Sequence, residues 1–182
     1  MKMINMIMSE NDVDDAFGVG YLQDRIDGEF PLARHIGVSV DCADDGGVLL
    51  RAPFAPNSNH KETAFGGSLF CVAVLTGWAW ATRYLESRGL NADAVIQEST
   101  IRYLKPVKHE FRGTLRAPPP EQLEKFLKML ARSGRGRIHL HVEIHDGPTL
   151  AARFDGVFVA ARRPAARAPG PSSIGEKLCP ES

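Results

Sequence analysis

Residues 57–68 read NSNHKETAFGGS, so polar side chains lie directly before two glycines. Backbone amides at such a turn can donate to a carbonyl oxygen on which negative charge develops. Gly66 and Gly67 have no β-carbon, and a carbonyl can therefore approach their N–H groups closely. If a helix begins there, its dipole adds to this stabilisation. The segment predicts a site for a carbonyl electrophile, with Phe65 and Gly66 in contact with the substrate.

Four residues of this segment are the candidate catalytic groups. Asn59 can donate from its amide but cannot act as a base, and His60 can donate a proton near neutral pH. Gly67 and Ser68 would supply backbone amides, and Ser68 also a hydroxyl. The alternatives are structural: Asn59 closes an Asx turn, His60 is an exposed loop residue, and the glycines only let a helix pack closely.

The stretch that follows must form the element that holds this site. Residues 64–81 contain no charged side chain. The length of this uncharged run is at the lower limit for a membrane-spanning helix. Several small and polar residues within it, and the strand-like segments after it, favour a helix buried on all sides inside a domain. We therefore expect a long central helix that begins at the glycines and no membrane partner.

The remaining chain predicts strands and two further helices. We expect helices over residues 13–26, closed by Pro31, and over residues 121–132 after three prolines. Strands are expected over residues 35–41, 48–54, 94–104, 108–117, 137–145 and 150–162, with the third and fourth paired. About six hairpin-connected strands predict one curved antiparallel sheet around the central helix, an α+β hotdog fold over residues 13–163. Residues 1–12 are expected to be a flexible N-terminus and residues 164–182 a disordered tail.

Composition narrows the partners and the compartment. The 182 residues carry 22 lysines and arginines and 22 aspartates and glutamates, which argues against nucleic acid as a partner. Three scattered cysteines without CxxC spacing predict reduced thiols in a cytoplasmic protein. The early acidic residues of the N-terminus do not fit a signal peptide.

Four motifs between residues 32 and 162 carry a family resemblance: NHKETAFGGSLF, VIQESTIRYLKPV, SGRGRIHLHVEI and FDGVFVAARR. In order and spacing they resemble the thioesterase family typified by the C-terminal domain of YiiD. The resemblance implies a hotdog fold, usually a homodimer or higher homo-oligomer, that acts on acyl thioesters of coenzyme A or acyl carrier protein without a further cofactor. Some members are malonyl-acyl carrier protein decarboxylases, which serve fatty acid synthesis. Glu62 stands where glycine is common, and Glu98 where aspartate is common.

The central helix lacks the acid that hydrolysis normally uses. Hotdog hydrolases typically carry an aspartate or glutamate in this helix or near its start, and Val74 occupies the equivalent position here. No acid occurs between Glu62 and Glu86. Decarboxylation of a malonyl thioester needs carbonyl polarisation and no base to start it, so the sequence favours it. Thioester hydrolysis and a non-catalytic acyl-binding module are the alternatives.

Polar residues in the third expected strand are candidate substrate contacts. Gln97, Glu98 and Ser99 interrupt an apolar run. Alternation places Gln97 and Ser99 on one face and Glu98 on the other. We expect one of these faces to reach the pocket of a partner subunit.

Basic residues further along the chain are candidates for binding the carrier. Arg135 and Arg137, and likewise Lys105, could contact the phosphates of a pantetheine arm or the acidic surface of a carrier protein. Solubility is their alternative role. His139, His141 and His145 alternate with apolar residues, which is typical of the solvated face of a strand, and no metal site is expected.

Overall fold

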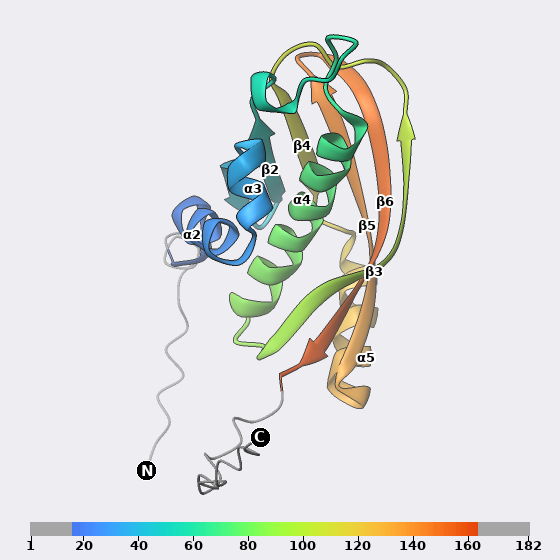
Figure 1. The fold of residues 1–182 in the computed structure, drawn as a ribbon. Helices are drawn as coiled ribbons and strands as arrows, with labels where there is room; N and C mark the ends of the chain where they lie inside the picture. Colours follow the sequence, from blue (N-terminus) through green and yellow to red (C-terminus); the bar gives the residue numbers. More distant parts are fainter. Residues whose placement is uncertain (1–15, 164–182) are drawn as a thin grey trace, which may run out of the picture.

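The computed structural model describes residues 16–163, in which a curved six-stranded antiparallel sheet wraps around one long helix (Figure 1). The strand order is β1-β2-β4-β5-β6-β3. The elements are α2 (Val19–Glu29), α3 (Pro31–Ile36), β1 (Ser39–Asp44), β2 (Gly47–Ala52), a 3-10 turn (Ala55–Asn57), α4 (Gly66–Glu86), β3 (Ala92–Tyr103), β4 (Phe111–Arg116), α5 (Pro120–Ser133), β5 (Arg135–Asp146) and β6 (Thr149–Arg162). The predicted α+β hotdog fold is confirmed. The expectations for residues 1–12 and 164–182 concern parts of the chain outside the described range.

Helix α4 is the core of the domain because it carries no charged side chain before Arg83, so almost every side of it can be covered. Two glycines allow the helix and the sheet to approach closely. A β-carbon on Gly77 would lie 2.5 Å from the ring of Phe158, and one on Gly113 would lie 2.6 Å from Thr76 Oγ1. Within residues 16–163, no helix is long and apolar enough to cross a membrane.

The predicted pairing of the third and fourth strands is wrong. β3 pairs with β6, and β4 lies between β2 and β5. The connection to β4 leaves the sheet directly after β3. There the backbone amides of Leu104 and Lys105 both donate to Ala151 O (2.8 and 3.1 Å). β3 and β4 follow each other in the sequence, but β5 and β6 lie between them in the sheet.

The N-terminal helical region also differs from its prediction. Pro31 does not end the region but occupies the first position of α3, where a missing N–H is tolerated. Gly37, with φ 71°, then ends α3 in the left-handed conformation. The strand expected from residue 35 consequently begins only at Ser39.

The two edges of the sheet are treated differently. On β1, the amide of Val40 donates to Gln23 Oε1 at 2.8 Å, so α2 occupies part of that edge. On β3, no element within residues 16–163 pairs with the outer edge. Val95 on this strand is 58% exposed. A long uncovered edge strand normally requires protection, and β3 is the place where this chain lacks it.

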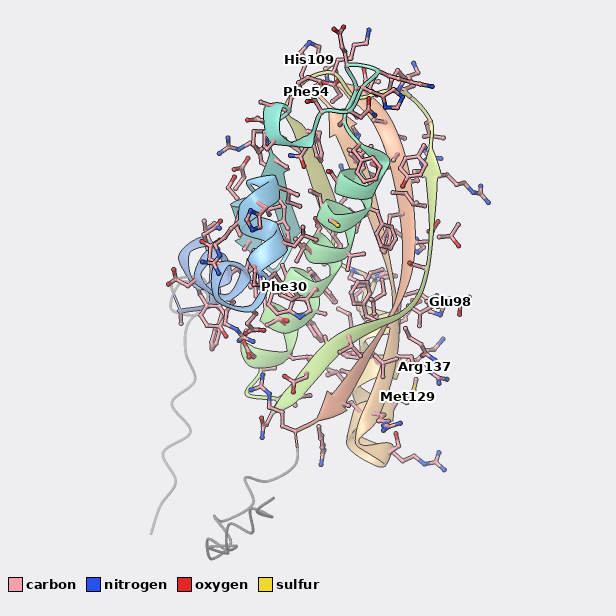
Figure 2. All side chains as sticks on the ribbon, viewed as in Figure 1. Phe30, Phe54, Glu98, His109, Met129 and Arg137 are labelled. Atoms are coloured by element: carbon pink, nitrogen blue, oxygen red, sulfur yellow. The ribbon has the colours of Figure 1, made fainter. Side chains whose placement is uncertain are left out.

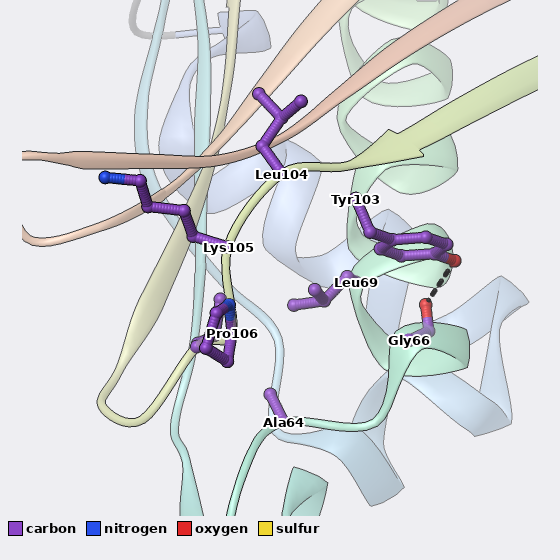
Figure 3. A pocket seen from close by; sticks show the side chains of 8 residues that line it. Ala64, Gly66, Leu69, Tyr103, Leu104, Lys105 and Pro106 are labelled. Carbon is purple, nitrogen blue, oxygen red and sulfur yellow. Dashed lines mark hydrogen bonds between the residues drawn. The ribbon is translucent and has the colours of Figure 1, made fainter.

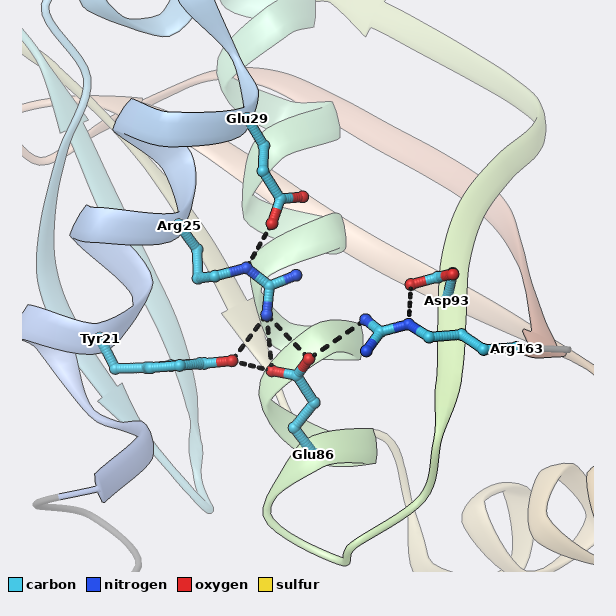
Figure 4. A network of polar contacts seen from close by, with 6 residues as sticks. All are labelled: Tyr21, Arg25, Glu29, Glu86, Asp93 and Arg163. Carbon is cyan, nitrogen blue, oxygen red and sulfur yellow. Dashed lines mark hydrogen bonds and ion pairs between the residues drawn. The ribbon is translucent and has the colours of Figure 1, made fainter. Parts of the chain in front are cut away.

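A polar network fastens the end of α4 that lies away from the glycines (Figure 4). Glu86 accepts hydrogen bonds from Tyr21 and from Arg25 Nη1, the latter at 2.8 Å. Arg163, just after β6, lies 3.4 Å from the same carboxylate and donates to Asp93 at 2.7 Å. The only acidic residue of α4 is thus engaged in joining α2, α4 and the end of β6.

Candidate active site

Asn57 fixes the polar segment before α4. It is 1% exposed, and its Nδ2 donates to Ile36 O (2.8 Å) and Pro53 O (2.7 Å). Its own backbone carbonyl accepts the Phe65 amide at 2.7 Å. Through its side chain and its backbone carbonyl, this one residue connects the end of α3, the residue after β2 and the start of α4. Sequence reasoning did not assign Asn57 a role, although it lies in the polar run.

Asn59 closes the next turn of the segment. Its backbone N–H donates to Thr63 O at 2.8 Å. In its side chain, Oδ1 accepts the Lys61 backbone N–H (2.8 Å) and Nδ2 donates to Thr63 Oγ1 (3.1 Å). This is the Asx-type role that was the structural alternative. Nδ2 keeps a second N–H for a ligand, and the side chain is only half-buried. His60 is exposed beside it.

Glu62 adopts an unusual backbone conformation in this turn. Its φ is 56°, and among residues 16–163 it is the only non-glycine residue with positive φ. This conformation favours glycine, which explains why relatives often carry glycine at the position. The side chain is exposed, and its amide donates to Asn59 O at 3.0 Å.

The start of α4 presents two backbone donors. The amides of Gly66 and Gly67 have no acceptor within residues 16–163, as expected for the first positions of a helix. The Ser68 amide, in contrast, donates to Phe65 O at 2.9 Å. The third amide expected from Ser68 is therefore not free, and the donor pair is Gly66 and Gly67. Phe65 is 59% exposed, and its ring covers Gly67, where an added β-carbon would lie 2.3 Å from Phe65 Cε1.

A cavity of about 360 Å³ opens beside these amides (Figure 3). Its walls are the segment from Ala64 to Leu69 and the end of β3 with the connection that follows. Tyr103 Oη donates to Gly66 O at 2.9 Å, and the Ala64 amide donates to Val107 O at 2.8 Å. The lining residues are Ala64, Gly66, Leu69, Tyr103, Leu104, Lys105, Pro106 and Val107.

The chemistry of the cavity is defined by what its lining contains. It has one phenol and one ammonium and no carboxylate. Burial, and to a lesser degree the nearby Cys71, raise the pKa of Tyr103, so its hydroxyl stays a neutral donor. Burial also raises the pKa of the Cys71 thiol, which makes it a poor nucleophile. The arrangement can polarise a carbonyl, but its lining offers no general base.

The family and structure comparisons agree with this geometry. Residues 19–162 match the family described as "Putative thioesterase (yiiD_Cterm)". The chain belongs to this family. The crystal structure of a protein of unknown function from Chlorobaculum tepidum TLS superposes with a TM-score of 0.77 at 25% identity, covering 87% of this chain and 100% of that one.

Two further solved structures extend the comparison. A "putative thioesterase" from Shewanella oneidensis has a TM-score of 0.69 at 26% identity, covering 81% of this chain and 98% of that one. A Pseudomonas aeruginosa protein described as a "probable thioesterase" has a TM-score of 0.70 at 21% identity, covering 79% and 95%. The last shares the fold alone. Membership of the YiiD C-terminal family supports an acyl-thioester enzyme in general.

The expected contacts on β3 lie apart from the cavity. A bulge between Ile96 and Glu98 interrupts the alternation on which their assignment to faces depended. Glu98 pairs with Val157 on the outer face of the sheet, and Gln97 accepts a hydrogen bond from Arg137 Nε on that same face (3.1 Å). Ser99, opposite buried Gly156, faces the helix side. Gln97 and Glu98 are therefore on one face, contrary to the prediction.

Arg135 and Arg137 belong to a second surface feature. Both are exposed on β5, and with Gln97 they line a cavity of about 520 Å³ between β3 and the end of α5. Figure 2 shows Arg137, Glu98 and Met129 on the side of the sheet away from α4. These arginines contact no residue of the Gly66 cavity, so within one chain they are not part of that site.

The sequence did not place Tyr103 or Lys105 in this cavity. Both lie in a motif that carries the family resemblance. Tyr103 was interpreted only as the end of a strand, and Lys105 as a possible contact for the phosphates or the acidic surface of the carrier. Trp78, an aromatic residue of α4, does not line this cavity and packs against Phe30 with ring centroids 4.7 Å apart. The Tyr-Leu-Lys-Pro run after a strand was the available signal, since it sets a rigid segment beside the helix start.

Proposed function

We propose that this protein decarboxylates malonyl thioesters, carried on acyl carrier protein or coenzyme A, to acetyl thioesters for fatty acid synthesis. The observation that carries the proposal is the Gly66 cavity, which lies beside two free helix amides and has no carboxylate in its lining. Helix α4 adds none, because its only acid, Glu86, is engaged at the other end. A hydrolase would need a base that this corner does not contain.

The reaction would begin with the thioester oxygen bound to the amides of Gly66 and Gly67. The carbon–carbon bond to the carboxylate then breaks, CO2 leaves, and the electron pair forms the enolate of the acetyl thioester. The helix amides and the α4 dipole stabilise the enolate oxygen, and one such donor contributes about 3 kcal/mol. His60 or water supplies the proton that completes the methyl group, and Asn59 can donate its remaining N–H to the substrate.

The apolar lining supports the same reaction. Leu69 and Val107 are buried in the walls of the cavity. A carboxylate held in such surroundings loses hydration that the neutral CO2 product does not need. This lowers the barrier to CO2 loss without a catalytic base.

We propose that the working unit is a homodimer or a higher homo-oligomer. The β3 edge is 12 residues long and unpaired in the described chain, and Tyr103, next to the cavity, is 53% exposed. A second copy that pairs with β3 would protect the edge and cover the cavity mouth. Arg135 and Arg137 would then be available for the phosphate or acidic surface of the carrier. The scattered cysteines agree with a cytoplasmic location.

Glu62 provides a test between decarboxylation and hydrolysis. It is the acidic residue nearest in sequence to Gly66. If the protein were a thioesterase, Glu62 would be the candidate general base. We expect the Glu62→Gly protein and the unmodified protein to release CO2 from malonyl-coenzyme A at the same rate. The free energy of unfolding should change by less than about 1 kcal/mol, because relief of the left-handed conformation is offset by the entropy of glycine.

The measurement is CO2 release followed alongside urea unfolding of both proteins. Loss of turnover in a folded Glu62→Gly protein would show that this carboxylate acts in catalysis and would favour the thioesterase alternative. If neither protein turns over any thioester but acyl-coenzyme A raises Tm, the chain is an acyl-binding module.

A further inference from the structure

We infer that the Gly66 cavity selects acyl groups that end in a carboxylate, and that Lys105 is the residue that recognises this carboxylate. The inference rests on the proposed placement of the acyl group in this cavity, but it does not depend on which reaction follows. It assigns a specificity-determining role to a lysine that the sequence predicted only as a possible contact for the phosphates or the acidic surface of the carrier.

The backbone around Lys105 is fixed before any ligand binds. The amides of Leu104 and Lys105 share the acceptor Ala151 O, and Pro106 follows directly. Val107 then accepts the Ala64 amide across the cavity. Lys105 is therefore held at the rim of the cavity by its backbone, whereas its side chain is exposed.

Lys105 is the single charged residue that lines the cavity. Within residues 16–163 its ammonium takes part in no hydrogen bond or ion pair. In Figure 3 the ammonium lies across the cavity from Gly66 and points outward. A lysine has a flexible four-carbon stem, so the ammonium can swing toward a ligand.

The cavity has two polar ends, as an acyl group with a terminal carboxylate requires. The helix amides at Gly66 and Gly67 form the end that binds the thioester oxygen. Lys105 supplies a positive charge at the opposite rim, with no competing carboxylate among the lining residues. An acyl group with a neutral end would gain nothing from this charge, whereas a malonyl group would form an ion pair with it.

Recognition by Lys105 should affect capture of the substrate more than chemistry. An ammonium at the rim binds the carboxylate of the ground state, and that charge disappears as CO2 forms. Its removal therefore raises KM and leaves kcat unchanged or higher. A residue that only maintained the fold would lower both activity and Tm.

The test compares Lys105→Met with Lys105→Arg and with the control Lys108→Met. Lys108 is also exposed and lies three residues further on, but it does not line the cavity. We expect Lys105→Met to raise KM for malonyl-coenzyme A about fivefold, the size of one exposed ion pair. Lys105→Arg should restore most of the loss, and Lys108→Met should match the unmodified protein.

Binding of unreactive analogues separates this inference from the proposed reaction. Calorimetry with coenzyme A thioethers that carry either a carboxyl-ended or a methyl-ended group requires no turnover. Lys105→Met should weaken only the carboxyl-ended analogue. The role of Lys105 would be overturned if Lys105→Met weakened the binding of both analogues equally. It would also be overturned if Lys108→Met weakened the binding of the carboxyl-ended analogue as much as Lys105→Met does. Selective weakening without any CO2 release would leave the role intact and refute the decarboxylation.

Discussion

Replacing Gly67 with alanine is expected to lower kcat/KM for malonyl-coenzyme A about 100-fold, the effect of losing one well-placed oxyanion donor. A β-carbon at this position would lie 2.3 Å from Phe65 Cε1. The Phe65 ring must therefore move. The alanine methyl group would then occupy the space through which the thioester carbonyl approaches the backbone amide of residue 67. Alanine is a better helix former than glycine by about 1 kcal/mol, so Tm should be unchanged or higher.

A matched control for this substitution is available in α2. Gly20 occupies the second position of α2, as Gly67 does in α4, and a β-carbon there would have no neighbour within 4 Å. Gly20→Ala should leave turnover unchanged. Steady-state kinetics and thermal unfolding of both variants check the prediction. Full activity of Gly67→Ala would contradict the assignment of the helix amides, as would an activity loss that merely follows a lower Tm.

The substitution Asn57→Asp is expected to destabilise the fold by about 3 to 5 kcal/mol. Nδ2 is the donor to Ile36 O and Pro53 O, and both hydrogen bonds lie in a side chain that is 1% exposed. A carboxylate would place negative charge against two carbonyl oxygens and leave them without a donor. The start of α4 would also be affected, because the Asn57 carbonyl accepts the Phe65 amide.

Urea unfolding measures this effect directly. The control is the same substitution at Asn91, an exposed residue of the turn before β3, where the change should stay within about 0.5 kcal/mol. If Asn57→Asp unfolded at the same urea concentration as Asn91→Asp, Asn57 could not be the residue that fixes this segment.

The sequence was most informative where the structure depends on local features. The uncharged run after Gly67 predicted α4 because a helix without charge must be covered on all sides. The paired glycines predicted the free amides because the first N–H groups of any helix lack partners. These inferences needed no knowledge of distant contacts, and the structure supports them, except that the Ser68 amide donates to Phe65 O.

The parts that could not be predicted depend on long-range placement. Lys105 reaches the cavity only because the connection after β3 passes the start of β6, where Ala151 O accepts two amides. Nothing in the local pattern indicates that crossing, and the assumption of a β3–β4 hairpin concealed it. The bulge at Gln97 is equally invisible to a simple alternation of faces. It moved a predicted contact to the other side of the sheet.

The proposed decarboxylation is tested most directly by supplying malonyl-acyl carrier protein and measuring CO2, free thiol and acetyl thioester in the same reaction. A carboxylate-free cavity beside two helix amides predicts equal amounts of CO2 and acetyl-carrier, with no release of the carrier thiol. Thiol release that matches substrate consumption, with malonate formed and no CO2, would contradict it and identify a thioesterase.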